Sequence, residues 1–263
     1  MFIHINSKGG SGKSTTANQV TAAYIYDRQK VKADLVEIDD ENQDSATFHK
    51  SEIMNIELIS THDIDSLENL LLDNEPNAII DVGGNKTATF FLEEVEKLGL
   101  GDEKIWMIAI DDGEQSAQNA IDTYAHIKLI DEEATIIFVL GRSFSMNKLF
   151  IQDQFINFFG NRYLDNANEH SILAKIPDAQ YIVIRNSLAI KLSRYLNKTA
   201  YELAKSDTDF KFKARKAKRE GDEAMKKKYL YFNRVKRYAV EFVKEMLEPT
   251  FEKLDKILET KEA

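Results

Sequence analysis

Residues 8–15 read Lys8-Gly9-Gly10-Ser11-Gly12-Lys13-Ser14-Thr15, and this stretch decides the fold class. A glycine-rich turn that exposes consecutive backbone N–H groups ahead of a helix forms a site for phosphate. The flanking sequence supplies that context, because an apolar strand is predicted over residues 2–5 and a helix over 14–28. We therefore predict a P-loop in which Lys13 reaches the β- and γ-phosphates and Ser14 binds Mg²⁺, while the backbone around the phosphates comes from Gly9, Gly10, Ser11, Gly12 and Thr15.

The loop departs from the common pattern G-x-x-x-x-G-K-[ST] at two places. Ser7 stands where that pattern has glycine, and an additional lysine, Lys8, follows it. The stretch resembles the deviant Walker A box of the ParA/MinD family of ATPases, which position plasmids, chromosomes and the division machinery. In that family the early lysine touches the phosphates of the nucleotide held by the other subunit. The resemblance implies ATP as the ligand, a homodimer in the ATP state and a catalytic role for Lys8 across the dimer.

Two further carboxylate sites belong to the predicted chemistry. Asp81 ends the apolar stretch 77–82, as does a Walker B aspartate that holds Mg²⁺. Residues 38–47 look like the second box of the same family, Asp-Xaa-Asp-Pro-Gln-Gly-Asn-Ala-Thr. The match implies that Asp39 contacts the hydration shell of Mg²⁺ and that Glu41, in place of the second aspartate, orients the attacking water. Glutamate displaces its carboxylate relative to aspartate, so hydrolysis is expected to be slow, or Asp40 takes that role.

Composition agrees with a nucleotide-binding protein of the cytoplasm. The 263 residues suffice for one large domain, and no apolar run approaches the roughly 20 residues that span a bilayer. The N-terminus enters a strand at once, without the regions of a signal peptide. The absence of cysteine excludes disulfides, thiolate metal sites and iron–sulfur clusters.

Strands and helices alternate along residues 1–190. Strands are predicted at 2–5, 33–38, 56–60, 77–82, 104–110, 135–140 and 172–176, with helices at 14–28, 64–73, 87–98, 115–129 and 147–159. This alternation predicts an α/β fold with a mostly parallel twisted sheet covered by helices on both faces. We assign residues 1–190 to a P-loop ATPase domain.

Residues 191–263 are predicted to be helical, packed on the ATPase domain or on its dimer partner. An apolar stripe with a spacing of three and four runs from Ala239 to Leu258, and Pro249 is expected to kink or divide it. The last 25 residues carry many acids, which an anionic bilayer would repel, so no membrane partner is expected.

The net charge of −9 conceals a strong asymmetry. Residues 210–237 hold twelve basic residues against three acids, a net charge of +9, so the remainder carries −18. Such a surface suits the phosphate backbone of duplex DNA, bound without regard to sequence, although a solvated helical face is the alternative. The candidate DNA-binding residues are Lys211, Lys213, Arg215, Lys216, Lys218, Arg219, Lys226, Lys227, Lys228, Arg234, Lys236 and Arg237.

The resemblance implies a function for these parts together. It predicts a ParA-like ATPase, associated with the nucleoid, that drives plasmid or DNA partition and whose weak hydrolysis is stimulated by a DNA-bound adaptor protein. Lys175-Ile176-Pro177-Asp178 resembles the family's late element near adenine, which implies nucleotide contact by Pro177. The preceding asparagine of the family is absent, since that region reads Val139-Leu140-Gly141-Arg142.

Other classes remain open. An accessory ATPase for conjugation or DNA transfer would share every motif and differ in its partner. A small-molecule kinase or synthetase on the same P-loop fold would not use Lys8 for dimerisation. A MinD-like membrane ATPase would need a basic terminal amphipathic helix, which this chain lacks.

Overall fold

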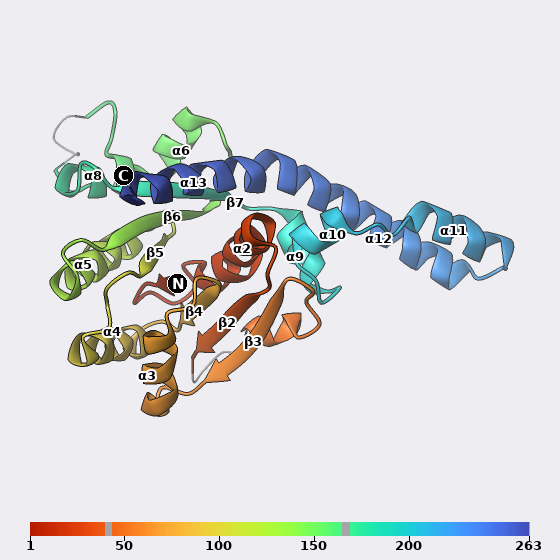
Figure 1. The fold of residues 1–263 in the computed structure, drawn as a ribbon. Helices are drawn as coiled ribbons and strands as arrows, with labels where there is room; N and C mark the ends of the chain where they lie inside the picture. Colours follow the sequence, from red (N-terminus) through yellow and green to blue (C-terminus); the bar gives the residue numbers. More distant parts are fainter. Residues whose placement is uncertain (40–43, 165–168, 263) are drawn as a thin grey trace.

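The computed structural model describes residues 1–39, 44–164 and 169–262, which form one α/β layer structure with a projecting arm (Figure 1). All strand pairs are parallel, in a seven-stranded sheet of order β3-β2-β4-β1-β5-β6-β7. The strands are β1 Phe2–Ile5, β2 Ala33–Ile38, β3 Met54–Ile59, β4 Ala78–Val82, β5 Ile105–Ile110, β6 Thr135–Ser143 and β7 Gln180–Arg185. The predicted α/β class with a parallel sheet is confirmed.

The helices connect these strands and continue beyond the last one. Those of the α/β part are α1 Lys13–Thr16, η1 Ala17–Thr21, α2 Ala22–Gln29, η2 Asp44–Phe48, α3 Ile64–Asp73, α4 Lys86–Leu98, α5 Glu114–Ile130, α6 Lys148–Gln154, α7 Ile156–Phe159 and α8 Ile172–Lys175. The C-terminal ones are α9 Leu188–Arg194, α10 Ala200–Lys205, α11 Phe210–Arg219, α12 Glu223–Phe242, η4 Val243–Leu247 and α13 Glu248–Glu262.

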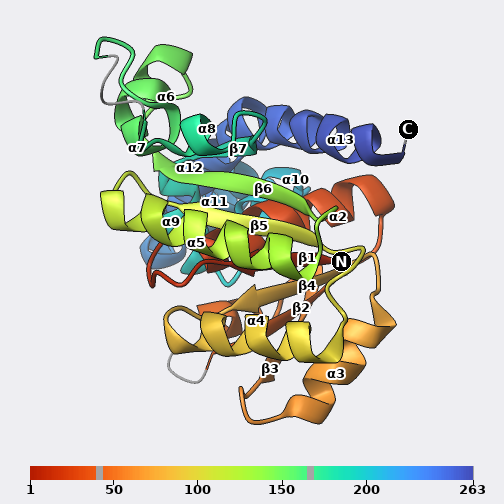
Figure 2. The same ribbon diagram turned by 90° about the vertical axis from the view of Figure 1, so that its left-hand side faces the viewer.

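Two apolar cores lie on the two faces of the sheet, because successive residues of a buried strand point to opposite faces. Ile3 and Ile5 of β1 face a core completed by α3, α4, α5 and the short helices α6 to α8. Phe2 faces the other core, which contains η1, α2, α9, α10 and the helices from α12 to α13. Figure 2 shows α4 and α5 on the near side of the strands and the C-terminal helices behind and above them.

One predicted strand is wrong. The helical turn α8 lies at Ile172–Lys175 instead, with Ile176 as its C-cap, and the last strand is β7 at 180–185. The side chain of Ser171 accepts a hydrogen bond from the Ala174 N–H at 3.2 Å and so caps a helix. Ile172 and Ile176 are buried four residues apart, as on one side of a helix, whereas β7 alternates with Ile182 and Ile184 buried.

Of the two outcomes expected at Pro249, a kink or a division, the division is wrong, because the helix continues from α12 through η4 into α13. The π-helical turn η4 lies directly before α13, and Pro249 is the second residue of α13. The change in hydrogen-bond pattern between η4 and α13 lets the helix accommodate Pro249, which has no N–H to donate. The predicted helix at 147–159 is divided at Phe155 into α6 and α7. None of the helices described is long and apolar enough to cross a membrane.

Candidate functional site

The loop between β1 and α1 adopts backbone conformations that its glycines permit. Gly10 has φ of 74° and Gly12 has φ of 101°, in the left-handed region that residues with a Cβ rarely enter. Gly12 is the N-cap of α1, and the helix continues from Lys13 to Gln29 through the π-helical turn η1. The loop therefore presents backbone N–H groups and a helix N-terminus at the carboxyl end of the central strand, which suits a phosphate group.

Lys13 lies over this loop with its ammonium buried. Its Nζ donates to the carbonyl oxygens of Asn6 at 3.1 Å and Lys8 at 3.2 Å. Burial lowers the pKa of Lys13, and the negative charges of Asp81 and Asp39 act against that lowering. A buried ammonium that donates to two carbonyls, with two carboxylates nearby, is placed to meet an anionic ligand.

The two predicted Mg²⁺ carboxylates converge on the same loop. Asp81 is 2% exposed in β4, the strand that pairs with β1, and Asp39 follows β2. Gly83 and Gly84 make the approach possible, since a Cβ on Gly83 would lie 2.9 Å from Cγ of Asp39. A Cβ on Gly84 would lie 3.0 Å from the backbone of Gly9. The pair of glycines after Asp81 therefore lets the β4 loop touch both the P-loop and Asp39.

One cavity of about 490 Å³ collects most of the predicted site. Its lining includes Gly9, Gly10, Gly12, Lys13, Ser14, Thr15, Asp39 and Asp81. Ser11 is fully buried and does not line it. Pro177 does not line it either, because it precedes β7 and lies at the amino edge of the sheet, whereas the loop follows the carboxyl end of β1.

The same cavity is lined by charged residues that the sequence analysis did not identify, namely Glu37, Lys86, Arg142 and Arg194. Arg142 has φ of 59° at a register shift near the end of β6. Its guanidinium has no hydrogen-bond or ion-pair partner among the described residues. No local sequence pattern predicts that Arg142 lines the cavity, because its position depends on an irregularity in β6 and on a positive φ.

Lys8 is held within its own chain. Its ammonium contacts the carboxylate of Asp111, just after β5, at 2.8 and 3.0 Å. Burial raises the pKa of the Asp111 carboxyl. The hydrogen bonds from Lys8 and the Gly113 N–H together lower this pKa by more, so the net shift is downward. Asp111 is a further residue that the sequence analysis missed.

The oxygen donors around the cavity fit Mg²⁺. Ser14, Asp39 and Asp81 offer one hydroxyl and two carboxylates, which are hard ligands. Within 1–39, 44–164 and 169–262, no three His, Asp or Glu side chains lie close enough to hold a metal by themselves. Mg²⁺ usually keeps several waters and binds through one or two carboxylates together with substrate phosphates, so this donor set is adequate. Glu41 and Asp40 lie outside the described residues.

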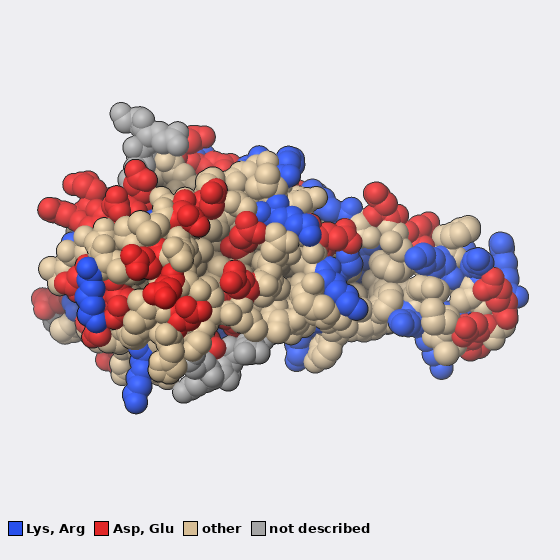
Figure 3. All heavy atoms as spheres, turned by 60° about the horizontal axis from the view of Figure 1, so that its bottom comes forward, with Lys and Arg blue, Asp and Glu red and all other residues tan. Residues whose placement is uncertain are grey.

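The basic segment forms a second candidate site. Helices α11 and α12 make a hairpin that projects from the layered body (Figure 1). We call residues 210–237 the arm. Ala214 and Ala217 are buried in the hairpin, and Phe210 packs edge-to-face on Phe232 with ring centroids 5.5 Å apart. In Figure 3 acidic side chains gather over the body and basic ones over the arm, apart from a group of acids at its tip.

Not every cation of the arm is available to a ligand. Lys216 contacts Glu220 at 3.8 Å, and Lys226 contacts Glu223 at 3.0 Å. Lys213 and Lys228 lie over aromatic rings, and Lys236 donates to the carbonyls of Ser206 and Thr208. The remaining basic residues are exposed and have no ion-pair partner among the described residues: Lys211, Arg215, Lys218, Arg219, Lys227, Arg234 and Arg237.

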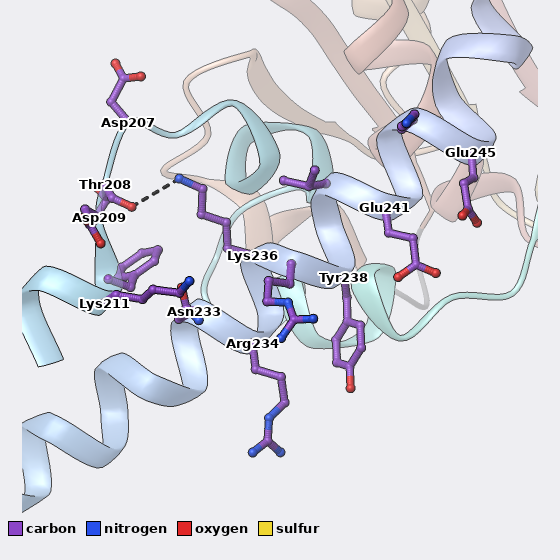
Figure 4. A pocket seen from close by; sticks show the side chains of 14 residues that line it. Asp207, Thr208, Asp209, Lys211, Asn233, Arg234, Lys236, Tyr238, Glu241 and Glu245 are labelled. Carbon is purple, nitrogen blue, oxygen red and sulfur yellow. Dashed lines mark hydrogen bonds between the residues drawn. The ribbon is translucent and has the colours of Figure 1, made fainter.

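A groove of about 760 Å³ lies where the arm joins the body. Figure 4 shows Lys236 turned toward Thr208, which accepts its hydrogen bond at 3.2 Å, while Arg234 extends in another direction. The groove is lined by residues of both charges, because its five basic residues are accompanied by Asp207, Asp209, Glu241 and Glu245. The groove is therefore less positive than the outer surface of the arm.

The sheet order, the loop and the buried lysine define a P-loop type of α/β fold. No model of a protein family matches the sequence, and no curated protein matches it significantly. Among solved structures, the fold is similar to a nucleotide-binding protein from Archaeoglobus fulgidus in complex with ADP and with cobalt. The TM-score is 0.46 at 14% identity, over 74% of this chain and 85% of that one. At these values the similarity carries no functional information, so the geometry of the site itself must do so.

Proposed function

We propose that this chain is a ParA-like ATPase that binds MgATP in the P-loop cavity, dimerises on ATP and binds duplex DNA through the arm. Weak hydrolysis, stimulated by a DNA-bound adaptor, would reset the switch and drive DNA partition. The observation that carries the proposal is that one edge of the sheet brings together the P-loop, Lys13, Asp39 and Asp81 around a single cavity.

Nucleotide binding is the best supported part. The loop amides and Lys13 offer positive charge to phosphates, and Ser14, Asp39 and Asp81 supply oxygen ligands for Mg²⁺. Phosphoryl transfer needs mainly positioning and neutralisation of charge, which these groups can provide without a covalent step. Mg²⁺, when bound, would neutralise charge on the phosphate oxygens. ATP, rather than another nucleotide, rests on the resemblance to the family.

Dimerisation is supported by Lys8. Its side chain is 31% exposed and lies at the edge of the sheet that carries the cavity. To reach a nucleotide in a second copy, the Lys8 ammonium must leave the Asp111 carboxylate and contact phosphate oxygens instead. The phosphates carry more negative charge than the carboxylate. Such an exchange would make the dimer depend on ATP.

DNA binding is supported by the charge and the shape of the arm. Seven exposed cations that have no ion-pair partner among the described residues lie on a projecting hairpin, and the body that carries the opposite charge is set back from it. A flexible cation beside few acids contacts DNA phosphates without reading sequence. We leave Lys236 out of the proposed contacts, because its ammonium is used within the chain.

The test is co-sedimentation with arbitrary duplex DNA at two salt concentrations, in MgATP and in MgADP, for wild type and Lys8→Ala. We expect salt-sensitive binding in MgATP, weaker binding in MgADP and loss in Lys8→Ala. Equal binding in both nucleotides would refute the ATP switch, and absence of binding in every state would refute the DNA function. ATP turnover that appears only with a small-molecule acceptor would indicate a kinase instead.

A further inference from the structure

Glu37 is a buried acid that the predicted site does not use. It lies in β2, is 3% exposed and lines the P-loop cavity. Its Cα is paired in register with that of Asp81 in the adjacent strand β4. Alternation along β2 places Glu37 on the same face as Leu35, toward the core that contains η1 and α2. A carboxylate at this depth costs free energy unless its partners compensate, so its hydrogen bonds are informative.

These bonds connect β2 to the P-loop helix. Oε2 of Glu37 accepts a hydrogen bond from the Ser45 N–H at 3.0 Å, at the beginning of η2. The Ser45 hydroxyl accepts one from the Asn18 side-chain amide at 3.1 Å. The same amide nitrogen donates to the carbonyl oxygen of Ser14 at 2.7 Å. Ser45 and Asn18, in the middle of the series, are buried, which protects the hydrogen bond between them from water.

The two ends of this network carry the proposed Mg²⁺ ligands. The series ends at the carbonyl oxygen of Ser14, and Asp39 lies two residues beyond Glu37, directly after the end of β2. These ligands come from different elements, so their separation depends on what joins α1 to the end of β2. Mg²⁺ demands nearly ideal octahedral geometry, which makes it sensitive to such a separation.

We propose that Glu37 is a positioning residue for the metal: through Ser45 and Asn18 it holds the end of β2 against the P-loop helix, so that Ser14 and Asp39 are correctly spaced for Mg²⁺. This inference rests on the proposed function of the cavity. Glu37 acts here as a hydrogen-bond acceptor for Ser45, and not as a ligand of the metal. Its Gln variant retains a side-chain carbonyl and should therefore substitute for it, whereas Leu should not.

The test measures metal binding directly, with Mn²⁺ as the probe in the presence of saturating ADP and the free Mn²⁺ signal followed by electron paramagnetic resonance. ADP affinity in EDTA and the urea midpoint are measured beside it. We expect Glu37→Leu to weaken Mn²⁺ binding by about tenfold, as loss of outer partners of a metal site does. Glu37→Gln should stay within about threefold of wild type, and metal-free ADP binding should change little in either. Glu57→Leu, the same replacement at an exposed position of β3, is the matched control.

Ser45→Ala gives an independent test if Glu37→Leu folds poorly. It keeps the backbone bond to Glu37 and breaks only the link to Asn18, so a weaker Mn²⁺ affinity with an unchanged urea midpoint is expected. Wild-type Mn²⁺ affinity in both Glu37→Leu and Ser45→Ala would overturn the inference. So would parallel losses of metal-free ADP binding and stability, because they would mark a purely structural role. Absence of ADP binding by the wild type would instead overturn the proposed function.

Discussion

The ammonium of Lys8 contacts both carboxylate oxygens of Asp111, at 3.0 and 2.8 Å, within a single chain. Asp111 also accepts a hydrogen bond from the Gly113 N–H at 3.0 Å, which holds its carboxylate toward the P-loop. The pair keeps Lys8 beside its own loop. A lysine that serves a second copy must leave this position, and the strength of the pair then opposes dimerisation.

Removing the charge of Asp111 should therefore favour the dimer. We expect Asp111→Asn to dimerise at lower MgATP concentration than wild type, and Lys8→Ala not to dimerise. The cost in folding stability should stay below about 1 kcal/mol, since both side chains are partly exposed. Light scattering across an ATP titration measures the effect. A dimer that forms equally well in wild type and Asp111→Asn would show that the pair does not restrain Lys8.

Gly84 should be needed for nucleotide affinity. A Cβ there would lie 3.0 Å from Cα and N of Gly9, so Gly84→Ala must displace the P-loop backbone. We expect ADP affinity to fall by about tenfold or more, because small misplacements of a binding loop are costly. Isothermal titration calorimetry measures it.

Gly101→Ala is the matched control for this change. A Cβ on Gly101 would lie 2.2 Å from the Ile130 side chain, at a position that does not line the cavity. It should lower the unfolding midpoint and leave ADP affinity unchanged. Equal ADP affinity in Gly84→Ala and wild type would mean that the loop has room to move.

The sequence predicted the parts of this structure that depend on local pattern. The P-loop, with its strand and helix, follows from glycine spacing and apolar periodicity, and Asp81 was found because it ends a buried run. The parts that were missed depend on tertiary contacts. The role of Asp111 could not be predicted, because it depends on parallel strands that place Asp111 beside Lys8, which lies 103 residues earlier in the chain.

Arg142 and β7 illustrate two other reasons for failure. Arg142 reaches the cavity because of a register shift and a positive φ, neither of which its neighbours in sequence reveal. The last strand was placed at 172–176 instead of at β7, because that short apolar run resembles a buried strand in composition. A run of that length cannot be assigned to helix or strand by periodicity alone.

His4 should make the protein sensitive to acid. It is fully buried in β1, and burial lowers its pKa from 6.5 to about 3. The unfolded chain binds a proton below pH 6.5 and the folded chain does not, so stability falls as the pH falls from 6.5 toward 3. At pH 5 the loss due to this residue should be about 2 kcal/mol.

Urea unfolding of wild type and His4→Leu between pH 7 and 4.5 measures this loss. The variant should show a shallower dependence, so the difference in unfolding free energy should change by about 2 kcal/mol between pH 7 and 5. His49→Leu, at an exposed position, should follow wild type. Parallel curves for wild type and His4→Leu would show that His4 is not kept neutral by burial.

The cations of the arm should divide into two groups in their effect on DNA affinity. Alanine at three cations without an ion-pair partner among the described residues, Arg215, Lys218 and Lys227, should weaken DNA binding and reduce its dependence on salt. Each lost phosphate contact should lower the slope of log affinity against log salt by about 0.9. Fluorescence anisotropy with two unrelated duplexes, at several salt concentrations, gives both quantities.

The matched control is alanine at Lys213, Lys216 and Lys226. It removes the same charge from residues that already contact a ring or an acid. We expect the matched set to have the smaller effect, because these ammonium groups must first leave their partners. Equal losses from both sets would indicate that only total charge matters, and no loss from either would place the DNA elsewhere.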